Sequence, residues 1–375
     1  MSGPATNPFQ PGNGTVPPLL AGRDAEVGLA DRLLDQLAAG RRPPQDVLLY
    51  GPRGNGKTAL LLRIAEAARA RGFRVQDLPP SELEDRSSLI GQLQEYAGLT
   101  GARVTGANVG PVGVSTEPGQ PGRDARELLA AWIGQTGAPL VVLADEFHAV
   151  RPAVGTAFLN AVQATKGVGR PFLLVAAGTP DTPARIRRMG THNERGFRAR
   201  RIGRLDRSAT VEALAEPARS AGRPMTVEAA DALAEESQDY PYFIQLLGSA
   251  AWDTAERLEA GDVTETAARD AIAETREEIA SFYGARYMEA ERRGVAPALV
   301  PVASLMTARA GWVGYGELKP VLVEIAAENP DTSDPITLFE ILSDLGVIWE
   351  TADDHWEMGI PSFARYVLSR TAPHA

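Results

Sequence analysis

The chain of 375 residues contains no cysteine, only four histidines and only three lysines. Without cysteine it can form neither a disulfide framework nor a thiolate zinc site. The histidines, at positions 148, 192, 355 and 374, do not have the spacing of metal ligands. No apolar run reaches the roughly 18–20 residues of a membrane-spanning helix, and the first residues lack the charged start and apolar core of a signal peptide. We therefore expect a soluble cytoplasmic protein that does not bind a membrane.

Acidic residues outnumber basic ones, but the charges are unevenly distributed. The net charge is −10, and residues 296–375 hold 4 basic and 11 acidic side chains, a net of −7. By contrast, residues 185–207 contain nine arginines against Glu194 and Asp206. Because neutralisation of phosphates supplies most non-specific DNA affinity, the acidic C-terminal part argues against DNA binding there.

Apolar strand patterns alternate with helical patterns in the first half of the chain. We predict strands at 46–50, 73–77, 139–144 and 171–177, and helices at 25–39, 58–71, 82–96, 124–136 and 153–165. This alternation indicates an α/β fold with a mostly parallel sheet covered on both faces. The Gly/Val/Thr-rich segment 101–122 is predicted to be a loop or hairpin, and residues 1–16 a disordered tail.

From about Ser208 onward the patterns are helical. Ser208, Thr226 and Thr264 stand where helix N-caps are expected, and a long helix should run from Thr264 to about residue 289. After a boundary at 291–297, three helical patterns precede two short strands at 346–350 and 355–358. The segment 351–354 between these strands is a hairpin signal. This order of elements predicts a winged helix.

The sequence Gly51-Pro-Arg-Gly-Asn-Gly-Lys-Thr58 follows an apolar run and precedes a helical pattern, which is the setting of a phosphate-binding loop. The glycines allow successive N–H groups to point at phosphate oxygens. Lys57 can reach the β- and γ-phosphates, and the Thr58 hydroxyl can ligate Mg²⁺. Since the chain has 35 arginines and three lysines, a lysine here is not background composition. We predict ATP and Mg²⁺ as ligands, no other metal, and nucleotide contacts from Gly51, Pro52, Arg53, Gly54, Asn55, Gly56, Lys57, Thr58 and Ala59.

Two carboxylates end the apolar strand at 139–144. At the carboxyl end of a parallel strand, Asp145 can hold the Mg²⁺ shell and Glu146 can act as general base for the attacking water. His148 completes an Asp-Glu-x-His string that is also found in helicases, but no other helicase motif appears, so we interpret it as a solvated or helix-start residue. Thr179, just after the strand at 171–177, is either a plain turn residue or a hydroxyl that contacts the γ-phosphate.

With these motifs the chain resembles an AAA+ ATPase of the branch near STAND signalling ATPases and origin-recognition-type initiators, from about residue 17 to 371. Residues 18–24 resemble the adenine-side motif of that branch, and Thr179 resembles its sensor-1 residue. The segments 193–198 and 240–245 resemble those that carry the arginine finger and the Gly-x-Pro lid motif, and 359–363 resembles the end of the winged helix. The resemblance implies that Pro241 touches the nucleotide. In this chain Asp239 replaces the lid glycine, and the usual lid arginine is not evident.

The arginine stretch at 185–207 has three interpretations. It can be a solvated basic face, a nucleic-acid contact, for which it has few interleaved aromatics, or the source of an arginine finger acting on a neighbouring subunit. For the finger, Arg195 is favoured over Arg198.

These observations together predict a disordered tail at 1–16, an AAA+ domain at 17–207, a helical lid at 208–290 and a winged helix at 296–371. The function expected first is an ATPase, slow and dependent on self-association, that acts as a nucleotide-driven switch on a protein client. Lys57, Glu146, Thr179 and Arg195 are its expected catalytic residues, with Thr58 and Asp145 holding the metal. The alternatives are a DNA-binding initiator or transposition-type loader that uses the winged helix, and a nucleotide-binding scaffold with negligible turnover.

Overall fold

The computed structural model describes residues 6–12, 14–80, 85–97, 121–134, 138–166, 171–190, 195–309, 311–328 and 334–370. The chain divides into two compact units. The first, called here the sheet unit, comprises Ala25–Tyr50 and Leu60–Arg200, and the second, the helical unit, comprises Met1–Asp24, Gly51–Ala59 and Arg201–Ala375. Within the described ranges, no helix is both long and apolar enough to pass through a membrane.

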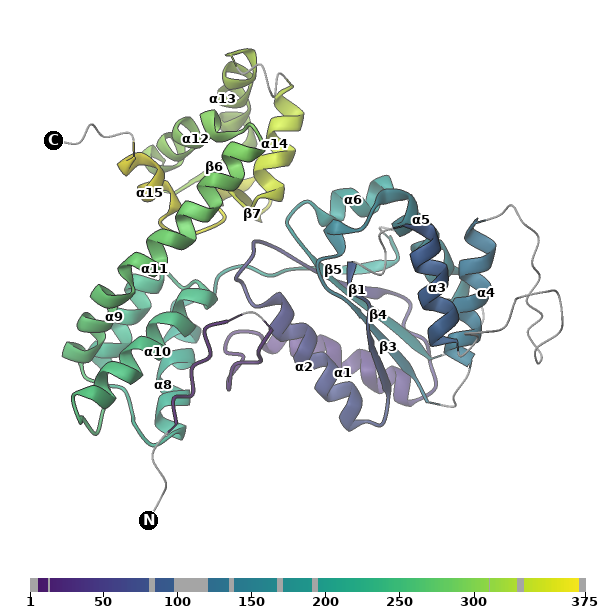
Figure 1. Cartoon of the computed structure of the whole chain (residues 1–375), viewed down its shortest axis with the longest axis horizontal. Helices are drawn as coiled ribbons and strands as arrows, with labels where there is room; N and C mark the ends of the chain where they lie inside the picture. Colours follow the sequence, from purple (N-terminus) through teal and green to yellow (C-terminus); the bar gives the residue numbers. More distant parts are fainter. Residues whose placement is uncertain are drawn as a thin grey trace. The chain divides into compact units, whose positions relative to one another are not determined.

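The sheet unit is built on five strands in the order β2-β3-β4-β1-β5 (Figure 1). The strands are β1 Asp46–Tyr50, β2 Arg74–Asp77, β3 Leu140–Ala144, β4 Phe172–Gly178 and β5 Phe197–Arg201. The pairs β1/β4, β4/β3 and β3/β2 are parallel. Because parallel strands end at the same edge, the residues that follow β1, β3 and β4 all start from one edge of the sheet.

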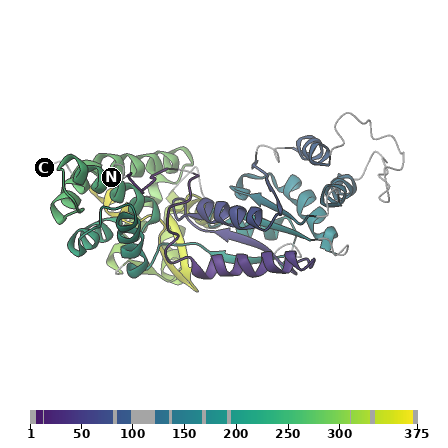
Figure 2. The same cartoon turned by 90° about the horizontal axis from the view of Figure 1, so that it is seen from below.

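Helices cover both faces of this sheet. They are α1 Asp24–Ala38, α2 Lys57–Ala70, α3 Arg86–Tyr96, α4 Pro121–Gly134, α5 Pro152–Lys166 and α6 Thr182–Arg188. Val142 and Leu174 share a hydrophobic cluster with α3, α4 and α5, while Val141 and Leu173, on the opposite face, are equally buried. On that opposite side lie α1 and α2, which run beside each other (Figures 1 and 2). The sheet is therefore apolar on both sides, as parallel sheets are.

The predicted α/β fold with a mostly parallel sheet is confirmed. The four predicted strands are present, each within one residue of its predicted bounds. The sequence analysis missed β5, because three arginines in five residues, Arg198, Arg200 and Arg201, hide its strand character. The loop or hairpin predicted at 101–122 lies outside the described residues except for its last two, which begin α4.

The third segment of the helical unit, from Arg201 onward, begins with α8 Arg207–Ser220, α9 Val227–Ser237, α10 Pro241–Arg257 and α11 Glu265–Arg292. Thr226 and Thr264 are N-caps, as predicted. The prediction for Ser208 is wrong, because Asp206 has the extended backbone of an N-cap and accepts the Ala209 N–H at 2.7 Å. Ser208 already lies inside α8 and donates its hydroxyl to the same carboxylate.

The last part of this unit contains α12 Ala296–Ala308, α13 Tyr315–Glu328, α14 Pro335–Asp344 and α15 Phe363–Ser369. Three antiparallel strands accompany them, β6 Trp312–Val313, β7 Ile348–Ala352 and β8 His355–Met358, in the order β6-β8-β7. The predicted hairpin is confirmed, but β7 extends to Ala352, so its turn lies at Asp353 and Asp354, the latter with a φ of +58°, instead of at 351–354. The sequence did not predict β6, which is two residues long.

The N-terminal segment corrects another prediction. Residues 1–16 were expected to be a disordered tail, but Phe9 is 4% exposed and belongs to the core of the helical unit. The Asn7 side chain donates to Ser249 and, at 2.8 Å, to Asp253, both in α10. The prediction fails for residues 6–12 because one aromatic ring fills the space above Gly248, where a Cβ would come within 2.7 Å of it.

Candidate nucleotide site

The phosphate loop, residues 51–58, follows β1 and ends in the first turn of α2. Gly54 and Gly56 have φ values of +80° and +84°, in the left-handed region that glycine adopts without steric cost. Lys57 is only 5% exposed, and its ammonium nitrogen lies 2.8 Å from the carbonyl oxygens of both Gly51 and Pro52. The loop therefore curls around its own lysine, beside the N-terminus of a helix that favours negative charge.

The segment that opens α10 bonds directly to this loop. The Tyr242 N–H donates to the carbonyl of Gly54 at 3.1 Å, and the Tyr240 hydroxyl donates to the carbonyl of Arg53. Tyr240 is fully buried, and burial raises the pKa of its phenol further above neutral pH. Pro241 is the first residue of α10, where its missing N–H costs nothing. The structure thus brings Pro241 and the phosphate loop together.

Asp239 stands where the resemblance implies a glycine. Its φ is +63°, a left-handed conformation that aspartate tolerates better than most residues. Its carboxylate lies 3.3 Å from Nε of Arg207. The turn that glycine would form is therefore kept, and Arg207 offsets the negative charge that the replacement introduces.

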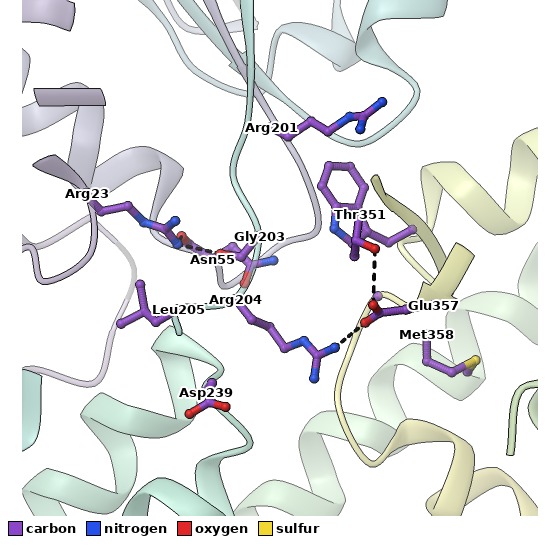
Figure 3. Close-up of a pocket in the computed structure, with 12 residues that line it drawn as sticks. Arg23, Asn55, Arg201, Gly203, Arg204, Leu205, Asp239, Thr351, Glu357 and Met358 are labelled. Carbon is purple, nitrogen blue, oxygen red and sulfur yellow. Dashed lines mark hydrogen bonds and ion pairs between the residues drawn. The ribbon is translucent and has the colours of Figure 1, made fainter. Parts of the chain in front are cut away.

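A cavity of about 500 Å³ lies beside the phosphate loop in the helical unit (Figure 3). Arg23 is 8% exposed and donates to the backbone carbonyls of Asn55, at 3.1 Å, and Gly203, at 2.5 Å. The Asn55 side chain is buried, and its Oδ1 has no hydrogen-bond partner among the described residues. An unsatisfied buried acceptor is costly, so this atom is suited to accept a hydrogen bond from a ligand. On the far side Arg204 pairs with Glu357, and further lining residues are Arg201, Leu205, Asp239 and Trp349.

Residues near the C-terminus also lie close to the phosphate loop. Trp349 in β7 is 5% exposed, and its ring would lie 3.4 Å from a Cβ placed on Gly51. A Cβ on Gly359 would lie 3.3 Å from the ring of Pro52. Sequence reasoning missed these residues, because no local pattern links β7 to a loop so far away in the chain. Only a tryptophan within a predicted strand could have drawn attention to position 349.

In the sheet unit, Asp145 and Glu146 follow β3 directly. The Glu146 N–H donates to Asp145 Oδ1 at 2.8 Å, and Glu146 has a φ of +49°, which is uncommon for a non-glycine residue. The next residues form a short 3-10 helix, Phe147–Ala149. His148 is 8% exposed, with its Nε2 3.4 Å from Glu146 Oε2. Of the two interpretations of His148, a solvated residue is wrong, because the turn folds its side chain back against Glu146, whereas a helix-start residue is confirmed by its place in this short helix.

Thr179 follows β4, the strand next to β3, so it starts from the same edge of the sheet as Asp145. Thr179 is 2% exposed, and its hydroxyl donates to Asp181 Oδ1 at 2.6 Å. Its carbonyl accepts the Thr182 N–H at 3.0 Å, which closes a turn. The structure thus brings the predicted sensor residue and the predicted metal ligand to one edge.

Arg195 lies elsewhere in the sheet unit. Its carbonyl accepts a hydrogen bond from the Gln45 side chain at 3.2 Å, and the next residue, Gly196, accepts the N–H of Asp46 at 2.8 Å. Arg195 is therefore beside the beginning of β1, whereas Asp145 is at the edge where the parallel strands end. Its side chain is exposed, and the structure does not bring it together with Asp145 and Glu146 of its own subunit.

The arginine stretch does not behave as one surface. Arg187, Arg188, Arg195 and Arg198 are exposed. Five of the nine arginines have a carboxylate within 4 Å among the described residues: Arg185 with Asp181, Arg200 with Glu26, Arg201 with Glu350, Arg204 with Glu357, and Arg207 with Asp239.

A parallel five-stranded sheet with a glycine-rich loop and lysine after β1, and carboxylates after β3, defines a P-loop nucleotide-binding fold. Residues 19–175 match the family described as AAA ATPase domain. No curated protein matches the sequence.

Solved structures extend the similarity to nearly the whole chain. A Walker-type ATPase of Pyrococcus abyssi is 16% identical, with a TM-score of 0.58, and the match covers 91% of this chain and 95% of that one. The ORC2 protein of Aeropyrum pernix in its ADP form is 16% identical, with a TM-score of 0.55 and coverage of 96% and 97%. Cdc6p of Pyrobaculum aerophilum is 14% identical, with a TM-score of 0.50 and coverage of 96% of both chains. At these identities the similarity shows the fold, which is that of origin-recognition-type AAA+ proteins.

Proposed function

We propose that this protein binds ATP at the phosphate loop and hydrolyses it, and that the nucleotide acts as a switch for a protein partner. The observation that carries the proposal is the buried Lys57, held inside a loop to which the start of α10 is bonded. Lys57 and the N–H groups of Gly54, Asn55 and Gly56 would bind phosphates. Glu146 would direct the attacking water, and Thr179 would contact the γ-phosphate.

The proposed metal is Mg²⁺, held by Thr58 and Asp145. This ion prefers oxygen ligands and usually takes only one or two from the protein, leaving the others to water and phosphate. A hydroxyl and a carboxylate fit that preference. Among the described residues no cluster of three His, Cys, Asp or Glu side chains could hold a metal unaided. When bound, Mg²⁺ would neutralise charge on the phosphates.

The cavity beside the loop supports binding of the nucleoside. Its volume of about 500 Å³ lies within the range of small-molecule sites. Asn55 Oδ1 offers an acceptor for an N–H or O–H group of the ligand, and Leu205 and Trp349 offer apolar surface. These features are consistent with a nucleotide whose phosphates lie in the loop and whose base lies in the cavity.

The proposed domains are an AAA+ domain at 17–207, a helical lid at 208–290 and a winged helix at 296–371. The helix-strand order and the three-stranded sheet support the last assignment. As in the sequence analysis, a protein partner is favoured over DNA, because α14 contains Glu340 and Asp344 but no basic residue. A DNA-binding initiator or loader remains the alternative function, and the protein would be expected in the cytoplasm.

The test compares two variants by calorimetric ATP binding and by ATP hydrolysis. Lys57→Ala should abolish ATP binding, whereas Glu146→Gln should bind ATP and lose at least roughly 10²-fold in turnover, because the first removes a phosphate contact and the second removes the base. Lys319→Ala, the same change at an exposed lysine of α13, is the matched control and should behave as the wild type. Equal loss of binding in the Lys57 and Glu146 variants would refute the assigned roles.

A further inference from the structure

A continuous series of polar contacts connects Glu146 to Thr179 inside the sheet unit. The Thr179 hydroxyl donates to Asp181 Oδ1 at 2.6 Å, and Arg185 Nε donates to the other oxygen of that carboxylate, Oδ2, at 2.5 Å. Arg185 Nη1 donates to the backbone carbonyl of His148 at 2.9 Å. The His148 ring nitrogen Nε2 lies 3.4 Å from Glu146 Oε2. Four contacts thus join the proposed γ-phosphate contact to the proposed general base.

The middle of this series is less exposed than the Glu146 end. The side chains of His148 and Asp181 are 10% and 13% exposed, while that of Glu146 is 44% exposed. A carboxylate that is nearly half exposed, on a backbone in a left-handed turn, has several rotamers available and needs a partner to fix its direction. His148 is in contact with it and is itself anchored through its carbonyl by Arg185. The ring is therefore placed to orient Glu146.

We infer that His148, Arg185 and Asp181 are positioning residues that couple the state of Thr179 to the orientation of Glu146. This inference rests on the proposed ATP hydrolysis. The Thr179 hydroxyl has one proton to donate, and in the structure that proton is given to Asp181. A γ-phosphate that accepts the hydrogen bond from Thr179 removes it from Asp181, which then keeps its interaction with Arg185. The resulting movement of Arg185 is transmitted through its hydrogen bond to the backbone of His148. Glu146, the proposed base, is therefore oriented when the phosphate is bound.

Steady-state ATP hydrolysis and calorimetric ATP binding test this coupling in the full chain. His148→Leu and Asp181→Asn should each lower kcat by roughly tenfold, a small part of the 10²–10⁴-fold that a general base supplies. The KM and the affinity for ATP should stay unchanged, because neither residue is a proposed ligand of the nucleotide. His148→Gln keeps an N–H donor near Glu146 and should retain most of kcat.

Helix α6 offers a matched control. Arg185→Met breaks the series and should lower kcat, whereas Arg187→Met makes the same change at an exposed position of the same helix and should not. If His148→Leu does not fold, as judged by its thermal unfolding, the Asp181 and Arg185 variants carry the test.

The double variant His148→Leu/Asp181→Asn separates a series from independent effects. Residues that act in one series should give a double variant no slower than the slower single variant, whereas independent effects should multiply to about a hundredfold loss. A multiplied loss, a raised KM instead of a lowered kcat, or equal effects of Arg185→Met and Arg187→Met would each overturn the inference. Failure of the proposed function looks different, since the wild type would then not bind ATP, or Glu146→Gln would hydrolyse it normally.

Discussion

The two left-handed glycines of the phosphate loop allow a controlled test of how the start of α10 is fixed to the loop. Gly54 and Gly56 have nearly equal φ values, +80° and +84°. A Cβ on Gly56 would meet nothing within 4 Å, whereas one on Gly54 would lie 2.8 Å from Cζ of Tyr240 and even closer to its hydroxyl oxygen. Alanine at the two positions therefore differs mainly in its clash with Tyr240.

The expected losses of stability follow from two costs, that of the left-handed backbone and that of the clash with Tyr240. The left-handed conformation costs alanine about 1–2 kcal/mol at either position. At position 54 the Tyr240 ring cannot retreat, because it is fully buried and packs on Phe243, with ring centroids 5.0 Å apart. Overpacking of this kind costs roughly 1–3 kcal/mol. Gly54→Ala should therefore destabilise the helical unit by about 1–3 kcal/mol more than Gly56→Ala.

Thermal unfolding without nucleotide measures this difference. At about 2–4 °C per kcal/mol for a unit of this size, the apparent Tm of Gly54→Ala should fall several degrees below that of Gly56→Ala. In a Tyr240→Phe background the gap should shrink, because the closest atom is the phenol oxygen. Equal Tm values for the two alanine variants would refute the close contact between Tyr240 and the loop.

Three further predictions concern assembly, DNA and pH. Because Arg195 lies away from the carboxylates of its own subunit, specific ATPase activity should rise with protein concentration, and Arg195→Ala should bind ATP normally yet lose roughly 10²–10³-fold in rate; concentration-independent turnover with a fully active variant would contradict this. Fluorescence anisotropy at about 150 mM salt should show no duplex-DNA affinity tighter than micromolar, because residues 296–375 carry a net charge of −7; tight, salt-sensitive binding would favour the initiator alternative. The hydrogen bond from Ala209 N–H lowers the pKa of Asp206, so its stabilisation of α8 is present above the unfolded-state pKa and is lost as the pH falls through the folded-state pKa. Asp206→Ala should therefore lower the Tm at neutral pH and leave it unchanged in strong acid, and an equal loss at both would contradict the capping role.

The sequence predicted what depends on local pattern. The phosphate loop was identified because glycine, lysine and threonine occur at fixed spacing between a strand and a helix, and the central strands because their apolar runs are continuous. Prediction from sequence failed where two neighbouring residues suited the same role, as with Ser208 and Asp206, since the side chains of both can cap a helix N-terminus. It also failed at β5, where two of the three arginines, Arg200 and Arg201, pair with carboxylates from other parts of the chain.

Contacts between distant segments could not be predicted at all. Neither the position of Trp349 against Gly51 nor that of His148 against Glu146 follows from periodicity or composition. The first requires the complete path of the helical unit, and the second depends on a left-handed backbone at a single residue. Sequence therefore indicated which residues carry the chemistry, while their supporting contacts required the structure.

Phe9 and Gly248 form a pair whose substitutions should not be independent. In the intact chain Gly248→Ala places a Cβ against the Phe9 ring and should be harmful. In a chain that begins after Phe9, the same change no longer meets that ring, and the higher helix propensity of alanine, worth up to about 1 kcal/mol, should make it beneficial. The sign of one mutation thus depends on a residue almost 240 positions earlier. Among related sequences the two positions should covary, with glycine in α10 accompanying an aromatic ring near the N-terminus.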